Sequence, residues 1–319
     1  MQGAQPNPTA AGGRAQRGAI PSSRPLWGVG LLMMSMWVLP CLDASGKWLV
    51  TNGVPLLFLT WMRYATHLLL MLVVLVPRRG IGVLASRRPF NQVVRGLGMV
   101  GASLMFFASL RYLPQAEATA ICYLSPLLVL LVAPWILKES PRLSSWLAAG
   151  LAFVGVLIII RPGGGLNPFG VTLGLLSALC FTTQYVFTRR VAIDDPYTSI
   201  IWGGLVGTVL LTPVLPFILP SAWPTLRELS PGAWMLLCST GVTGSIGHLL
   251  QIAAYRNAPA SALAPFSYFS VISATVVGWI VTGHFPDVVT WIGLLVIFTC
   301  GAGVGVYEWR RAKSRQGAQ

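Results

Sequence analysis

Residues 108–126 read ASLRYLPQAEATAICYLSP, and a related pattern, AAYRNAPASALAPFSYFSV, occupies residues 253–271. Both copies contain Arg-x-x-Pro, and both place Tyr-x-Ser nine residues after the proline. The copies lie 145 residues apart, and the same offset aligns eight identities across thirty-nine positions without a gap. An internal repeat of this kind predicts that the chain contains two copies of one structural unit.

Apolar segments of about 20 residues extend outward from both copies and cover most of the chain. The hydrophobic share is 55%, and only 9% of the residues are charged. A hydrocarbon core of about 30 Å needs about 20 residues of helix, so each segment is long enough to span a bilayer. The sequence therefore predicts an all-α membrane protein with ten transmembrane helices. Their expected positions are 26–46, 55–76, 94–112, 117–137, 143–161, 167–188, 197–219, 233–254, 260–282 and 287–307.

The basic residues indicate how these helices are oriented. If the N-terminus is cytoplasmic, seventeen of the 22 lysines and arginines fall in the cytoplasmic tails and loops, and four fall outside. Because cytoplasmic loops are enriched in Lys and Arg, we expect both termini to be cytoplasmic. The net charge of +14 is thus a topology signal and does not indicate a nucleic-acid partner. Five helices per copy is an odd number, so the two repeats must be inverted, an architecture of secondary transporters.

The predicted organisation has four parts. Residues 1–25 form a disordered cytoplasmic tail, 26–163 the first five-helix repeat, 164–308 the second, and 309–319 a basic cytoplasmic tail. We reject a signal peptide at the N-terminus, because the first apolar segment is long, lacks a clear cleavage site and leads into further spans.

The chain resembles the EamA type of the drug/metabolite transporter superfamily over nearly everything after residue 25. The residues that carry the resemblance are 43–47, 55–63 and 110–163, where LRYLPQAEATA, YLSPLL, LKES and IIIRPG stand in the family's order. It implies a ten-helix transporter of the bacterial inner membrane that moves metabolites or amino acids, most often outward. Glu139 fits the acidic position that follows the fourth helix in such repeats, but the equivalent residue in the second copy is His284. A mechanism that needs a symmetric pair of carboxylates is therefore not expected.

Charged residues within the predicted spans are the first candidates for a substrate path. Asp43 and Lys47 are spaced i,i+4 near the outer end of the first helix, and Arg63 lies about eight residues into the second. An ionised group at mid-bilayer costs about 2.5–3.5 kcal/mol, so Arg63 should face protein, water or a counter-ion. We expect Asp43 to be its partner. The pair is either a structural link between two helices or part of a substrate-carboxylate or proton-linked site.

Polar residues in the eighth span form a second candidate group. Ser245, His248 and Gln251 are spaced by three and should form one stripe facing the bundle interior. The histidine could couple proton movement to transport, or simply hydrogen-bond to a neighbouring helix.

Aromatic and amide side chains complete the candidates. Tyr123 and Tyr268 occupy equivalent repeat positions, and Ser270 follows the second of them. Pseudo-symmetry would place them around a central cavity, although tyrosines also anchor helices at bilayer interfaces. Gln184 in the sixth span is a further polar candidate, whose alternative role is a bond between helices.

The leading hypothesis is a secondary transporter that moves an amino acid or related metabolite, with export favoured, by alternating access. Uptake of a vitamin or nucleoside-like cofactor is an alternative, and a membrane-embedded lipid-handling protein is an alternative from another class. The chain lacks HExxH, G-x-S-x-G and Walker A patterns, so no enzymatic activity is expected. No cofactor or metal site is expected, since the five cysteines lack CxxC spacing. The expected partners are the substrate and the bilayer; coupling to a proton or an exchanged solute, and the oligomeric state, are left open.

Overall fold

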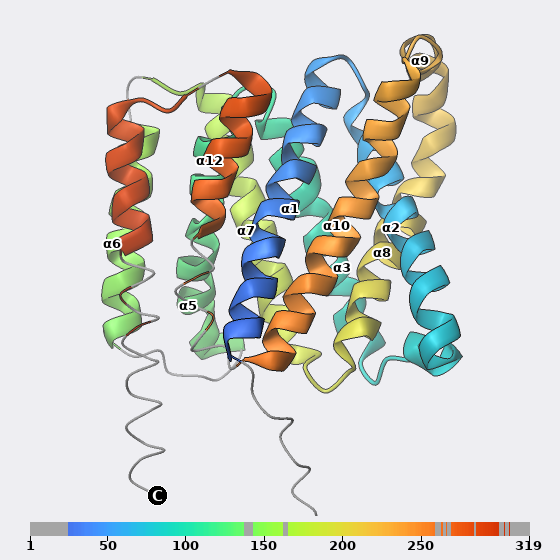
Figure 1. The fold of residues 1–319 in the computed structure, drawn as a ribbon, viewed down its shortest axis with the longest axis horizontal. Coiled ribbons are helices and arrows are strands. Elements are labelled where there is room, and N and C mark those ends of the chain that lie inside the picture. Colours follow the sequence, from blue (N-terminus) through green and yellow to red (C-terminus); the bar gives the residue numbers. More distant parts are fainter. Residues whose placement is uncertain are drawn as a thin grey trace, which may run out of the picture.

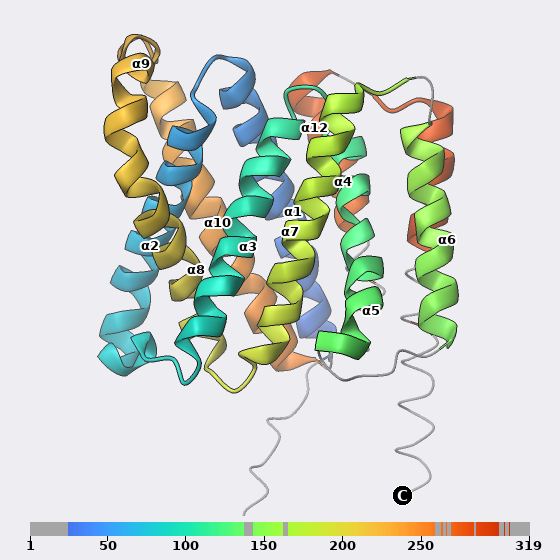
Figure 2. The same ribbon diagram turned by 180° about the vertical axis from the view of Figure 1, so that it is seen from behind.

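The computed structural model describes residues 25–136, 143–161, 165–258, 263, 266, 269–283, 285–299, 303 and 306. Within these residues the chain is helical and contains no strand. The helices stand side by side as a bundle (Figure 1; Figure 2). The first half contains α1 (Pro25–Thr51), α2 (Leu56–Arg79), η1 (Ile81–Leu84), α3 (Pro89–Ser109), α4 (Gln115–Cys122), α5 (Leu124–Ile136) and α6 (Leu143–Ile160). The second half contains α7 (Pro168–Arg190), α8 (Pro196–Leu211), η2 (Thr212–Val214), α9 (Leu215–Arg227), α10 (Pro231–Asn257), α12 (Phe269–Thr282) and the helix Val288–Thr299.

Each of the ten predicted spans overlaps at least one of these helices. Six helical stretches of the described chain are long and apolar enough to cross a membrane: Leu26–Thr51, Leu56–Arg79, Pro89–Ser109, Pro168–Arg190, Pro196–Arg227 and Pro231–Asn257. That all ten segments cross the bilayer stays a prediction. The terminal tails and Glu139 lie outside the described residues, as does His284.

The fourth predicted span is two helices instead of one. α4 ends at Cys122, Tyr123 forms a turn, and α5 begins at Leu124. Pro126 has no N–H, so the carbonyl of Cys122 loses its usual helical donor. The Ser125 hydroxyl donates to that carbonyl instead, at 2.7 Å. The break therefore follows from a Ser-Pro pair inside an otherwise helical run.

Helix starts are marked by proline and by capping side chains. Pro168, Pro196 and Pro231 each occupy the first residue of a helix, where a missing N–H costs nothing. The preceding residue caps each of these helices by accepting a hydrogen bond from a backbone N–H of the first turn. Local chemistry thus fixes where the membrane helices of the second half begin.

Helix pairing is most extensive between α1 and α10 and between α3 and α7. α2 lies against both α8 and α10, and α12 lies against α1 and α4. Gly98 allows the close approach of α3 to α7, because a Cβ there would lie 2.9 Å from the Gln184 backbone nitrogen. Small residues at such contacts let helix backbones pack closely in a membrane.

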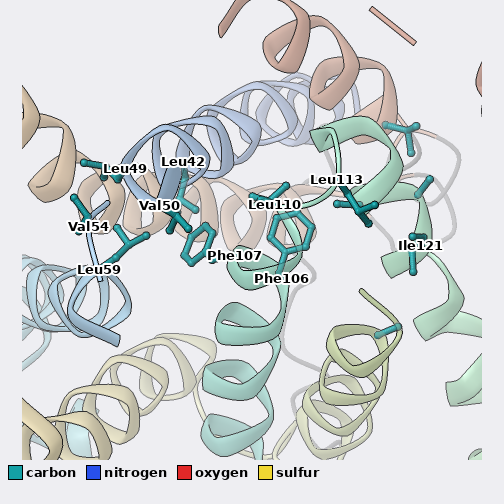
Figure 3. Packing of buried hydrophobic residues seen from close by; sticks show 14 of the residues in the cluster. Leu42, Leu49, Val50, Val54, Leu59, Phe106, Phe107, Leu110, Leu113 and Ile121 are labelled. Atoms are coloured by element: carbon teal, nitrogen blue, oxygen red, sulfur yellow. The ribbon is translucent and has the colours of Figure 1, made fainter. Parts of the chain in front are cut away.

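The largest buried apolar cluster contains residues from both halves of the chain. Leu42, Val50, Leu59, Phe107 and Leu110 pack together in it (Figure 3). Other large apolar side chains are exposed around the bundle, as expected of a surface that faces lipid.

Most of the described arginines gather at one edge of the bundle, which we call the basic edge. It is where α2, α7 and α10 end, with Arg79, Arg190 and Arg256 in their last turns (Figure 1). α1 begins at the same edge (Figure 2). This arrangement agrees with the cytoplasmic position predicted for these loops.

Candidate functional site

A narrow hollow in the bundle interior brings together two of the predicted site residues. It lies between α2, α3 and α10, and its walls leave no room for a water molecule. The lining residues are Arg63, Tyr64, His67, Met99, Gly241, Gly244 and His248. Close packing of α10 against α2 depends on Gly241, where a Cβ would lie 2.7 Å from the Arg63 carbonyl oxygen.

Arg63 is held in the hollow by a hydroxyl and two rings. Its Nη1 donates to the Ser103 hydroxyl at 2.6 Å. The Cζ atom lies 5.3 Å from the Tyr64 ring centroid and 5.5 Å from that of Phe107, so aromatic faces stabilise the cation. Tyr64 is itself fixed by hydrogen bonds to Ser103 and to the carbonyl of Met99.

The predicted direct pair between Asp43 and Arg63 is not what the structure shows. Among the described residues the ion pairs are Arg79 with Asp195 and Arg161 with Asp287. The charges of Asp43 and Arg63 are close enough to interact, but the hydrogen bond of Arg63 goes to Ser103. Sequence spacing indicates only that Asp43 and Arg63 lie at a similar depth in the bundle. The side-chain rotamers decide which group each of them contacts.

Two histidines, His67 and His248, meet beside the hollow. The rings of His67 and His248 are edge to face with centroids 6.2 Å apart. His67 hydrogen-bonds to the Ser245 hydroxyl at 2.8 Å through Nδ1 and to the Ile200 carbonyl through Nε2. His248 hydrogen-bonds to Gln251, and its buried Nε2 has no hydrogen-bond partner among the described residues.

Tyr123 and Ser270 meet directly. The Tyr123 hydroxyl, at the break between α4 and α5, hydrogen-bonds to the Ser270 hydroxyl near the start of α12. The contact joins the two halves of the chain across 147 residues. Tyr268 lies outside the described residues. Gln184 lies on α7, and its buried Oε1 has no hydrogen-bond partner among the described residues.

Sequence reasoning missed a polar network at the basic edge. Asp194, in the turn between α7 and α8, accepts hydrogen bonds from the Ser86 hydroxyl at 2.5 Å and the Arg87 N–H at 2.9 Å. Gln92 of α3 donates to both Asp194 and Ser199, each at 2.9 Å. The network ties the α2–α3 connection to the α7–α8 connection. The sequence feature that could have indicated this network is Asp194, an acidic residue among arginine-rich loops.

Arg95, also in α3, joins this network through Ser199. The sequence placed it with the cytoplasmic basic residues, but it is 8% exposed and donates to the Ser199 carbonyl at 2.7 Å and the Thr188 hydroxyl at 3.0 Å. No group of three or more His, Cys, Asp or Glu able to hold a metal occurs within the described part of the chain.

The proline in α1 creates a second polar link between the halves. Pro40 has no N–H to donate to the carbonyl of Met36, and the Ser273 hydroxyl of α12 donates to that carbonyl instead. Gln115 of α4 donates to the Pro40 carbonyl at 2.9 Å. Helix α1 is therefore bonded to both α4 and α12.

Comparison with known proteins identifies the family. A model of the EamA-like transporter family matches the chain twice, over residues 26–161 and 168–304. An S-adenosylmethionine uptake transporter from Rickettsia bellii is 25% identical over 297 residues, covering 91% of this chain and 96% of that protein. The pseudopaline exporter CntI of Pseudomonas aeruginosa is 27% identical over 237 residues, covering 72% and 80%. A crystal structure of a protein with 24% identity covers 90% of this chain and 98% of its own, with a TM-score of 0.62.

Proposed function

The chain belongs to the EamA-like transporter family, and we propose that it moves a small organic metabolite across the membrane by alternating access between two inverted repeats. It is a multi-pass protein of the bacterial inner membrane and a transporter, not an enzyme. The observation that carries the proposal is the double match of the family model, whose two segments coincide with the predicted repeats.

The pairing of helices supports the two-repeat interpretation. If α1 is equivalent to α7 and α3 to α10, exchanging the halves turns the α1–α10 contact into the α7–α3 contact. The same exchange relates α2–α10 to α8–α3, and α1–α12 to the packing of α7 against α4 and α5. Such interchange is expected for repeats related by a pseudo-two-fold axis.

The proposed substrate path lies between the repeats and uses the polar side chains that face the interior. Tyr123 and Ser270 bridge the halves, and a contact of this kind must break or move when one half rocks against the other. The proposed path residues are Asp43, Arg63, Tyr123, Gln184, His248, Gln251, Tyr268 and Ser270.

We infer that the solute is an amino acid or an amino-acid derivative. The named relatives include an uptake transporter for S-adenosylmethionine, which by its name joins an amino acid to adenosine, and an exporter for pseudopaline. Export is the direction that we propose. Uptake of a nucleoside-like cofactor is the second candidate, because the S-adenosylmethionine relatives cover nearly the whole chain.

Counterflow in liposomes tests the proposal. Purified protein is reconstituted with unlabelled solute inside, and labelled amino acids or S-adenosylmethionine are added outside. A carrier accumulates label transiently and saturates, because entry of label is exchanged for the internal solute. Saturable counterflow of one compound supports the proposal, linear uptake indicates a channel, and no uptake of any compound by folded protein favours the lipid-handling alternative.

Tyr123→Phe is the informative variant, because it removes only the hydroxyl that bonds to Ser270. We expect it to change the rate of counterflow severalfold at unchanged folding. Tyr112→Phe is its matched control, since Tyr112 is 44% exposed and packs its ring on Phe169 away from the path. Equal rates in the parent and both variants would contradict a role for the Tyr123 contact.

A further inference from the structure

We propose that Tyr185 and Tyr255 line the cytoplasmic entrance of the substrate path, and that the structure is the inward-facing state, closed on the opposite side where α1 packs against α3. This inference rests on the proposed function. It adds two solute-contacting residues to the path residues named above.

The helices that carry the two tyrosines belong to different layers of the bundle. α10 packs against α1 and α2, whereas α7 packs against α3, α4 and α5. α1 and α10 stand in front in Figure 1, and α3 and α7 stand in front in Figure 2, which views the bundle from behind. Side chains that point from α7 and α10 toward each other therefore lie inside the bundle and not on its lipid-facing surface.

On the side opposite the basic edge, the two layers pack directly on each other. A Cβ at Gly46 of α1 would lie 2.4 Å from Cε1 of Phe107 in α3, so no space remains between these helices there. The Lys47 ammonium donates to the Leu113 carbonyl at 3.1 Å, which ties α1 to the connection between α3 and α4. Val50 and Phe107 belong to the same buried apolar cluster (Figure 3). This contact closes the outer side.

Near the basic edge, α1 and α10 pack within their own layer. Leu32 and Met36 of α1 form a buried cluster with Ala254 of α10. Tyr185 lies five residues before the end of α7, and Tyr255 lies two residues before the end of α10. These tyrosines are 45% and 50% exposed. The side chains of α7 and α10 thus remain accessible on this side of the bundle.

Both tyrosines point into the bundle, because each lies opposite an exposed apolar residue of its own helix. Tyr185 follows Leu176 by nine residues, and Tyr255 follows Ile246 by nine. Nine residues make about two and a half turns of an α-helix, which places the two side chains on opposite faces. Tyr185 and Tyr255 are also close enough to interact electrostatically. Their exposed area therefore faces the space between α7 and α10, and that space is open to solvent.

The entrance offers aromatic faces together with hydroxyl groups. Phe181, one turn before Tyr185, stacks on its ring with the centroids 6.0 Å apart. Tyr185 also interacts electrostatically with Cys122, at the end of α4, so it reaches toward the interior. A tyrosine contacts the apolar part of an organic solute with its ring and a polar part with its hydroxyl. Tyr185 and Tyr255 are thus the first contacts of a solute that enters from the cytoplasm, as export requires.

Cysteine labelling tests the entrance without a known substrate. In a background without native cysteines, Tyr185→Cys and Tyr255→Cys should react with an impermeant thiol reagent added to inside-out membrane vesicles, because the reactive thiolate forms where water reaches the sulfur. The same reagent added outside intact cells should react at least about tenfold more slowly, because the outward-facing state is then the minor one.

Thr183→Cys and Ala253→Cys are the matched controls, each two residues from one of the tyrosines. They follow Leu176 and Ile246 by seven residues, about two helical turns, and so lie on the opposite faces of α7 and α10 from the tyrosines. Both should react slowly from either side. Folding of every variant is checked by its unfolding temperature in detergent micelles, and if one tyrosine variant fails to fold, the other tests the entrance.

Protection by solute tests the contact itself. A compound that shows counterflow should slow the cytoplasmic labelling of both tyrosine positions by at least about threefold at saturating concentration, because bound solute covers them. Labelling of Asn52→Cys, in the exposed connection after α1, should not change. Unchanged labelling at both tyrosine positions would overturn their assignment as solute contacts.

The remaining outcomes separate this inference from the proposed function. Labelling of the tyrosine positions from outside as fast as from inside, labelling no faster than the controls, or no labelling of folded protein would overturn the entrance. Fast labelling from the cytoplasmic side without counterflow of any tested compound would support the entrance and contradict the transport proposal. Counterflow by a parent whose tyrosine positions do not react would do the reverse.

Discussion

The carboxylate of Asp194 accepts three hydrogen bonds from the segment that connects α2 to α3 and from α3 itself. It is 8% exposed and accepts bonds from Ser86, Gln92 and the backbone of Arg87. Asp194→Asn should lower the free energy of unfolding at pH 7 by about 1–3 kcal/mol, because charged acceptors give stronger bonds than an amide. Heat or denaturant unfolding in detergent micelles measures the effect. The neighbouring Asp195, in an exposed ion pair with Arg79, is the control, and Asp195→Asn should cost at most about 1 kcal/mol.

The same residue should shape the acid stability of the protein. Burial acts to raise the pKa of Asp194, but the hydrogen bonds from Ser86, Gln92 and Arg87 outweigh it and hold the pKa below its usual range. A carboxylate with a lowered folded pKa stabilises the folded state above its unfolded pKa of about 3.9, and this contribution disappears as the pH falls through the folded value. The stability of the parent should therefore fall more steeply below about pH 4 than that of Asp194→Asn. Parallel curves would contradict the assignment.

Sequence reasoning reached part of the candidate site. Arg63 and His248 are recognisable because a charge and an imidazole are rare in apolar spans, and the structure places both at one hollow. The contact of Tyr123 with Ser270 is consistent with the repeat, which predicted that both lie near the centre. The Ser103 partner of Arg63 and the role of His67 depend on rotamers and helix rotation, which no spacing rule specifies.

At the level of elements, Gly207 shows how closely the helices pack. It lies in α8, where a Cβ would fall 2.4 Å from Cγ of Tyr64 in α2, a fully buried ring fixed by two hydrogen bonds. Gly207→Ala should therefore destabilise the protein by about 1–3 kcal/mol, since the ring cannot move without losing those bonds.

Unfolding of Gly30→Ala provides the comparison. Gly30 is also helical, but nothing lies within 4 Å of a Cβ placed there. Replacing a helical glycine in open space should be neutral or stabilise by up to about 1 kcal/mol. Similar losses of stability in the two variants would mean that helix propensity, not contact with Tyr64, sets the cost at Gly207.

The positions of the helices were easier to predict from the sequence than the breaks within them. Every predicted span contains a helix. Length and hydropathy are enough to predict this, because inside a membrane an apolar segment must satisfy its backbone hydrogen bonds internally, which a helix does. The break at Tyr123 was not predicted, although Pro126 was visible in the sequence. The seventh span was predicted to end at residue 219, but the helical stretch continues to Arg227. A proline signals a lost donor, and tertiary packing decides whether the helix breaks, kinks or continues.

Over the whole molecule, the two halves meet differently at the two edges. At the basic edge, Thr198 donates to the Val83 carbonyl at 2.7 Å and Trp202 to the Leu84 carbonyl at 2.9 Å, beside the Asp194 network. At the opposite edge, Val54 belongs to the same buried apolar cluster as Leu226, and Arg161 pairs with Asp287. Alternating access, as proposed, would require hydrogen bonds to be exchanged at the basic edge, and an ion pair to be broken and apolar surface to be exposed at the other.

Orientation of the repeats is the last prediction, and it can be tested without a substrate. The connection after the first helix of each repeat contains Asn52 in one copy and Ile193 in the other, and both side chains are exposed. In inverted repeats these equivalent connections lie on opposite sides of the membrane. In a background without native cysteines, Asn52→Cys should react with an impermeant thiol reagent added outside intact cells, and Ile193→Cys only after the membrane is opened. Glu228→Cys, beyond α9, should behave like Asn52→Cys, because an even number of predicted spans separates them. Labelling of Asn52→Cys and Ile193→Cys from the same side would mean that the repeats are parallel or that a predicted span does not cross.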